Sequence, residues 1–213
     1  MKRYLIAFLI MGIASALDVD HILARVKAKY DSISTMQGRF SQITSVKGVG
    51  ESARFEGRFY LKRPDLLRLE ILTPESQLFV YDGKNLWTYI KGINTVYKTE
   101  FTNQTPFFSP FTILKDYKER YRVDSLPEEE GGLVWIKLIP KTPEPLPIPI
   151  SLGIDLRTYY IKGLGAVDPA GNRQSFKLSN VIYNKKLSPK LFSFTPPEGA
   201  EVIEESPHIP SED

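Results

Sequence analysis

The sequence predicts a mainly β protein with a helical lid (α+β). The expected architecture is an incomplete, strongly curved antiparallel barrel of about ten to eleven strands, covered by an N-terminal helix and a short central helix. Three observations lead to this prediction: one amphipathic helix pattern opens the chain behind an apolar leader, alternating apolar and polar residues follow, and turn motifs separate the alternating stretches. A long sheet with one apolar face must close, stack or be covered, and only the two helical segments are available as a cover.

Residues 1–16 have the three parts of an export signal. Lys2 and Arg3 are basic, residues 4–13 are apolar, and small residues at 14–16 precede the expected cleavage after Ala16. The apolar part is far shorter than the ~20 residues that span a bilayer, so a membrane anchor is the weaker interpretation.

We therefore expect three segments. Residues 1–16 are a cleaved signal peptide, residues 17–200 are a single half-barrel domain, and residues 201–213 are a flexible acidic tail. The chain has no cysteine, which excludes disulfides and thiolate metal ligands. Its net charge of +3 falls to about +1 without the signal, which argues against general nucleic-acid binding.

The helix pattern starts at Asp18, and its apolar residues recur at three- and four-residue spacings. They are Val19, Ile22, Leu23, Val26, Tyr30 and Ile33. Asp18 or Asp20 can cap the N-terminus, and the hydroxyl-rich residues 32–35 compete for backbone hydrogen bonds, so we expect the helix to end there.

Beyond the helix the apolar period changes to two, which predicts half-buried antiparallel strands. The predicted strands are 36–43, 54–62, 67–72, 77–81, 86–90, 95–98, 121–125, 134–139, 150–156, 159–167 and 173–182. Residues 106–118 are Phe-rich without alternation, so we expect a short helix or a covering loop. The proline run from Pro140 to Pro149 excludes a central strand there and predicts an extended loop or a sheet edge.

The apolar face of this sheet has two interpretations. Its side chains can simply fill the core, or they can line a cavity for an apolar ligand, and the pattern leaves both open. The candidate cavity residues are Phe40, Phe55, Phe59, Leu61, Leu67, Leu69, Ile71, Phe79, Tyr81, Trp87, Phe107 and Phe111.

Catalytic chemistry finds little support in the sequence. His21 and His208 have no neighbours spaced as metal ligands or as a triad. The carboxylates of residues 128–130 precede Gly131 and read as a solvated turn. We expect no catalytic residue, no metal and no cofactor, so an enzyme acting on a glycerolipid is the weakest of the functional hypotheses.

Six phrases of the chain, taken in order, resemble the LolA family of periplasmic carriers of outer-membrane lipoproteins. They are residues 36–42 (MQGRFSQ), 57–64 (GRFYLKRP), 82–89 (DGKNLWTY), 105–107 (TPF), 168–172 (DPAGN) and 192–199 (FSFTPPEG). The resemblance covers nearly all of the chain after the export signal. It implies a periplasmic chaperone whose half-barrel accepts the acyl chains of a lipoprotein.

The resemblance also implies roles that the residue pattern alone does not give. Arg63 matches a basic residue that holds the lid shut by hydrogen bonds to backbone carbonyls of the lid helix; without the family, Arg63 reads as a solvated residue entering a turn. The implied partners are acylated lipoproteins as cargo, an inner-membrane ABC-type lipoprotein-releasing complex and an outer-membrane lipoprotein receptor. We expect a monomer.

Two departures from the family pattern leave the cargo and the partner surface open. Leu67 stands where relatives can have an aromatic residue, and the proline run is an elaboration. The alternative function is therefore a periplasmic lipid-binding or envelope-stress sensor module with the same half-barrel, docking through the proline run and the acidic tail.

Overall fold

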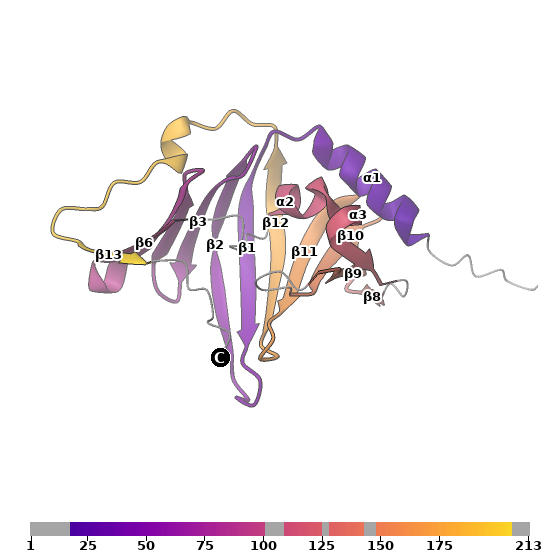
Figure 1. The fold of residues 1–213 in the computed structure, drawn as a ribbon, viewed down its shortest axis with the longest axis horizontal. Coiled ribbons are helices and arrows are strands. Elements are labelled where there is room, and N and C mark those ends of the chain that lie inside the picture. The colour runs from indigo at the N-terminus through magenta and orange to yellow at the C-terminus, as the bar shows by residue number, and fades with distance from the viewer. Residues whose placement is uncertain (1–17, 101–108, 125–127, 143–147, 206–213) are drawn as a thin grey trace, which may run out of the picture.

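The computed structural model describes residues 18–100, 109–124, 128–142 and 148–205 (Figure 1). The expected signal peptide, Phe107, His208 and the middle of the proline run lie outside these described residues. One large sheet dominates the fold, and short helices pack on one of its faces. No helix within the described ranges is long and apolar enough to cross a bilayer.

Helix α1 spans Val19–Asp31, where the sequence predicts it. Of the two candidate caps Asp18 is the one used, because its side chain accepts a 3.0 Å hydrogen bond from the His21 N–H. At the other end the Ser32 hydroxyl donates to the carbonyl of Lys29 at 2.8 Å. The hydroxyl-rich segment therefore ends the helix by satisfying one of its last carbonyls.

The described residues form a sheet of thirteen strands. They are β1 (Thr35–Ser45), β2 (Ser52–Lys62), β3 (Leu66–Thr73), β4 (Gln77–Tyr81), β5 (Asn85–Ile90), β6 (Thr95–Glu100), β7 (Tyr121–Val123), β8 (Glu128–Glu130), β9 (Leu133–Pro140), β10 (Ile150–Asp155), β11 (Tyr160–Val167), β12 (Arg173–Tyr183) and β13 (Glu201–Glu205). Their order is β13-β6-β5-β4-β3-β2-β1-β12-β11-β10-β9-β7, with β8 also on β9. All neighbours are antiparallel except β13 and β6. The predicted fold class is confirmed.

Two of these strands were not predicted from the sequence. Residues 128–130, predicted as a solvated turn, form β8 on β9, and residues 201–205, predicted as part of a flexible tail, form β13 beside β6. An edge strand needs backbone partners rather than an apolar face, so a Glu-rich segment can pair without showing alternation. Lys98 and Glu204 add an ion pair of 2.8 Å across the β6–β13 pair. The division into domains otherwise stays a prediction.

The Phe-rich central segment contains two short helices, α2 (Pro110–Lys115) and α3 (Tyr117–Arg120). Ser109 and Thr112 form a capping box at the start of α2. Figure 1 shows α2 and α3 in front of β10, β11 and β12, with α1 running along the upper edge. Two 3₁₀ turns, η1 (Lys91–Ile93) and η2 (Pro189–Phe192), complete the fold.

The strand registers define two faces of the sheet. We call the face that shares its core with α1 and α2 the inner face and the opposite one the outer face. On the inner face of β1 and β2, Gly38 lies opposite Phe59 and Phe40 lies opposite Gly57. A Cβ on Gly57 would stand 2.7 Å from the Phe40 ring and 2.0 Å from the carbonyl oxygen of Glu70. Each phenylalanine therefore packs over a glycine of the neighbouring strand, which the repeated Gly-x-Phe spacing makes possible.

A second, smaller apolar cluster lies on the outer face. Val80 and Val96 are fully buried there although α1 and α2 pack on the other side. The C-terminal segment, residues 184–205, covers them: the carbonyl of Leu191 accepts a 3.4 Å hydrogen bond from Arg68, and Phe194 packs on β5. We call this segment the strap, and it ends in β13 at the sheet edge.

Candidate lipid-binding face and lid

The registers of β2, β3 and β4 gather apolar side chains into rows across the inner face. Phe59 lies opposite Leu69, which lies opposite Phe79. Of the candidate cavity residues, the sheet places these on the inner face: Phe40, Phe55, Phe59, Leu61, Leu67, Leu69, Ile71, Phe79 and Tyr81. Together they form a continuous apolar surface on one half of the sheet.

This surface is only partly filled by the core. Phe40, Phe59 and Leu61 are at most 5 % exposed, and Phe111 of α2 is buried in the same cluster at 3 %. By contrast Phe55, Leu69 and Phe79, together with Leu86 of β5, are only partly buried against that cluster. The inner face of β2–β5 therefore has apolar surface left over for a ligand, and Phe176 and Leu178 of β12 on the same face are partly buried too.

Trp87 was wrongly assigned to this surface. It lies opposite Val80 and Lys98, on the outer face, and its ring centroid is 5.7 Å from that of Phe194 in the strap. Its indole N–H donates to the Asp82 carboxylate at 2.9 Å. Leu86, which was not among the predicted cavity residues, lies opposite Tyr81 on the inner face.

Asp82 fixes this register. Its carboxylate accepts hydrogen bonds from the backbone N–H groups of Lys84 and Asn85 at 2.9 and 2.8 Å. Partial burial alone raises the pKa of Asp82, but these bonds and the one from Trp87 outweigh it, so its pKa is lowered. The carboxylate is thus a built-in turn cap, and its turn decides which face Trp87 occupies.

Arg63 follows β2 directly and contacts both lid helices. Its Nε donates to the carbonyl of Ile33 at 2.7 Å and its Nη2 to the carbonyl of Tyr30 at 2.8 Å. The carbonyls at a helix C-terminus lack intrahelical donors and carry the negative end of the helix dipole, so a guanidinium suits them. The guanidinium also lies 4.6 Å from the centroid of the Phe111 ring, in cation–π geometry.

Helix α1 also makes polar contacts with the β10–β11 turn and with the start of β11. The Tyr30 hydroxyl accepts a 3.1 Å hydrogen bond from the Ile161 N–H, and burial raises the pKa of Tyr30 well above its usual value. Arg25 donates to the Tyr159 hydroxyl at 3.2 Å, and Lys29 donates to the carbonyl of Thr158 at 2.6 Å. Helix α2 is only six residues long and packs through the buried side chains of Phe111, Ile113 and Leu114.

Comparison of the sequence with known protein families gives a match over most of the chain. The sequence profile described as "Outer membrane lipoprotein carrier protein LolA" matches residues 31–195. The chain belongs to the LolA family. The resemblance drawn from the six sequence phrases is thereby confirmed.

Named relatives of the LolA family match over most of their length. The outer-membrane lipoprotein carrier protein of Methylococcus capsulatus is 28% identical over 208 residues, which is 95% of this chain and 98% of the relative. That of Chromobacterium violaceum is 30% identical over 183 residues, covering 85% and 86%. The crystal structure of an uncharacterized conserved protein from Thermus thermophilus has a TM-score of 0.52 at 15% identity, covering 87% of this chain and 98% of that one. This last likeness shows the fold alone.

Proposed function

We propose that this LolA-family protein is a periplasmic carrier, not an enzyme, that binds the acyl chains of lipoproteins on the inner face of β2–β5. The observation that carries the proposal is the partly buried apolar surface of Phe55, Leu69, Phe79 and Leu86, next to a lid tied down by Arg63. The matching relatives are named as lipoprotein carriers, which supports the same assignment.

The size of the hydrophobic effect explains why a carrier is needed. Burying hydrocarbon gains roughly 0.8 kcal/mol per methylene, so a sixteen-carbon chain in water is disfavoured by on the order of 12 kcal/mol. A triacylated lipoprotein cannot cross an aqueous gap unaided at this cost. The carrier has to shield the chains and still release them.

The Arg63 contacts supply a physical basis for release. In the empty protein they stabilise the closed lid, and the cargo must displace α2 and its Phe111 to reach the inner face. Part of the binding free energy is then used to open the lid, so the net affinity is lowered. A lowered affinity favours transfer to an acceptor.

The proposed partners are those that membership of the LolA family implies. An inner-membrane ABC-type lipoprotein-releasing complex loads the carrier, because extraction from a bilayer requires work. An outer-membrane lipoprotein receptor accepts the cargo, and the carrier acts as a monomer.

Extraction of a lipoprotein tests the proposal. Purified protein is incubated with inner-membrane vesicles that carry a labelled triacylated lipoprotein, and gel filtration measures a soluble one-to-one complex. We expect an ATP-dependent complex whose yield falls at least tenfold in Leu69→Asn, on the inner face, and stays unchanged in Leu72→Asn, which is 49% exposed. A folded protein that leaves all lipoprotein in the vesicles contradicts the carrier and favours the sensor alternative.

A further inference from the structure

The outer face of the three central strands β12, β1 and β2 is strongly basic. The registers of these strands place six cations there, namely Arg39, Arg54, Arg58, Lys62, Arg173 and Lys177. Glu56 is the carboxylate on the same face of these strands. We call this surface the basic face. Within the described part of the chain none of its cations forms an ion pair with a carboxylate.

This charge is concentrated rather than spread over the molecule. The whole chain has a net charge of +3, less than the excess on the basic face, so the remainder is net negative. Arg39 and Arg58 stand directly opposite each other in the β1–β2 register. Like charges in that position destabilise a sheet. Glu70 stands opposite Arg58 in the β2–β3 register and offsets part of this cost, whereas Arg39 has Ser179 on its other side. The uncompensated charge of Arg39 favours a binding role.

The basic face ends in a protruding hairpin tip, residues 46–51, between β1 and β2. Val46 and Val49 are 46% and 57% exposed, and nearby Ile43 and Val167 are 40% and 37% exposed. Figure 1 shows the tip at the lower end of the molecule, away from α1 and α2 at the upper end. Arg63 lies at the upper end of the same hairpin, roughly 35 Å away for strands of this length.

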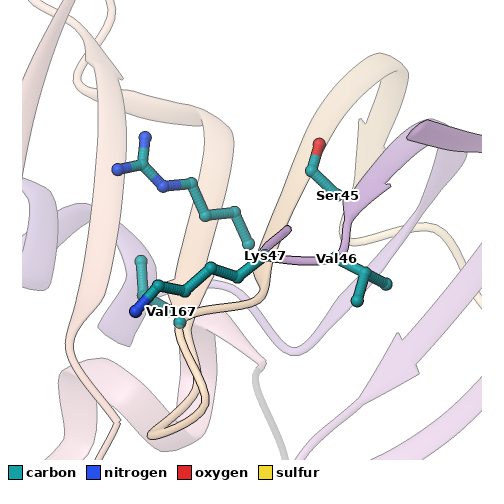
Figure 2. Close-up of a pocket in the computed structure, with 6 residues that line it drawn as sticks. Ser45, Val46, Lys47 and Val167 are labelled. Atoms are coloured by element: carbon teal, nitrogen blue, oxygen red, sulfur yellow. The ribbon is translucent and has the colours of Figure 1, made fainter. Parts of the chain in front are cut away.

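A hollow lies beside the tip, between it and the β11–β12 turn (Figure 2). It has a volume of about 360 Å³ and is lined by Ser45, Val46, Lys47, Val167, Gly171 and Arg173. The Lys47 side chain lies over the turn, because a Cβ on Gly171 would stand 2.7 Å from its Cδ. The hollow therefore combines two cations with two valine side chains.

The nearest carboxylate of that turn is engaged elsewhere. Asp168 accepts hydrogen bonds from the backbone N–H and the side-chain amide of Asn172 at 2.8 and 2.7 Å. Asn172 in turn accepts from the Lys47 backbone N–H at 3.0 Å, which fixes the tip against the turn. Among the described residues Asp168 forms no ion pair with Lys47 or Arg173, so the two cations remain available to an anion.

We propose that the hairpin tip and the basic face dock on the surface of an anionic phospholipid bilayer, with a phosphodiester headgroup in the hollow of Lys47 and Arg173. Unpaired cations spread over a broad face, next to exposed aliphatic side chains, suit a lipid interface better than a grooved protein partner.

Vesicle flotation tests the docking. Vesicles of phosphatidylcholine alone are compared with vesicles containing 30% phosphatidylglycerol, at low and at high salt. We expect the protein to float with the anionic vesicles only, and to be released at high salt. Lys47→Gln/Arg173→Gln should lower the bound fraction at least tenfold. Lys186→Gln/Lys190→Gln removes the same charge from exposed residues of the strap and should bind as the parent does.

A labelling experiment locates the contact independently of affinity. Because the chain has no cysteine, Val49→Cys and Ile93→Cys each provide one site for an environment-sensitive dye. Both positions are well exposed, at 57% and 63%. Anionic vesicles should shift the emission of the dye at position 49 to the blue and leave that at position 93 unchanged.

Three results would overturn the docking. They are equal flotation with neutral vesicles, unchanged flotation of Lys47→Gln/Arg173→Gln, and an identical dye response at both positions. Binding of soluble polyglutamate without binding of vesicles would assign the basic face to an acidic protein. Saturable binding of inorganic phosphate without binding of vesicles would reduce the hollow to a site for free phosphate.

Discussion

The guanidinium of Arg63 lies 4.6 Å from the centroid of the Phe111 ring while it donates hydrogen bonds to the carbonyl of Tyr30 in α1 and to that of Ile33 just after the helix. One side chain at the end of β2 thus joins both helical parts of the lid. The rest of α1 is held by its own contacts to the β10–β11 turn and to the start of β11. Loss of Arg63 is therefore expected to free α2 more than α1.

Replacement of Arg63 by leucine should weaken the closed lid. Two charge-assisted hydrogen bonds are lost, and because the side chain is partly exposed we expect about 2 kcal/mol, roughly thirtyfold in the ratio of closed to open lid. Arg63→Leu should bind acylated cargo more tightly and pass less of it to an acceptor, with faster hydrogen exchange in α2. Arg63→Lys keeps the charge and should be intermediate. Transfer by Arg63→Leu at the parent rate would show that Arg63 is no latch.

The two Gly-x-Phe pairs should respond unequally to alanine. A Cβ at Gly57 meets a backbone carbonyl oxygen at 2.0 Å, whereas one at Gly38 comes no closer than 3.0 Å to any neighbour. We expect Gly57→Ala to lower the free energy of unfolding by about 3 kcal/mol and Gly38→Ala by about 1 kcal/mol. Urea denaturation measures both, and equal losses would contradict the cross-strand packing.

Alkaline pH should destabilise the protein through its buried tyrosines. Burial raises the pKa of Tyr183 to about 12 and that of Tyr30 well above its usual value. Above pH ~10 the unfolded chain loses these protons while the folded chain keeps them, so stability falls as the pH rises. Tyr183→Phe should show a shallower fall in the urea midpoint between about pH 10 and 12. Tyr60→Phe, on the outer face, is the control, and parallel curves for the two variants would contradict the assignment.

Packing of the strap against the outer face of the sheet should depend on Phe194. Its ring centroid lies 5.7 Å from that of Trp87 and 6.1 Å from that of Tyr89, so Phe194→Ala removes most of the aromatic packing that holds the strap to β5. Hydrogen exchange in β13 should accelerate at least tenfold while that in β1 is unchanged. Val202→Ala, at a residue 45% exposed on β13 itself, should have little effect. Unchanged exchange in Phe194→Ala would mean that backbone pairing alone holds the strap.

Much of the inner face could be predicted because a strand buried on one face has an apolar side chain at every second residue. That pattern placed Phe55, Phe59 and Leu69 on one face. The face of Trp87 depends on the register of its hairpin, because the turn capped by Asp82 makes Leu86, not Trp87, the partner of Tyr81. The apolar cluster on the outer face could not be predicted, because the strap that covers it is distant in sequence from β4 and β6.

The lid contacts show a different limit. The guanidinium of Arg63 donates to the carbonyls of Tyr30 and Ile33, about thirty residues away in the chain. Every residue has a backbone carbonyl, so the residue pattern does not show which carbonyls will act as acceptors. Only the family resemblance pointed to Arg63. The β13 strand was missed for the same reason, since backbone pairing with β6 and not side-chain alternation places it.

Site-specific photocrosslinking tests the central claim most directly. A photoreactive phenylalanine analogue replaces Phe79 on the inner face of β4 or Trp87 on the outer face of β5, and the protein is loaded with a lipoprotein bearing radiolabelled acyl chains. Acyl-chain binding on the inner face predicts labelled crosslinks from position 79 and none from position 87. Equal crosslinking from both positions, or crosslinking from position 87 alone, would contradict acyl-chain binding on the inner face.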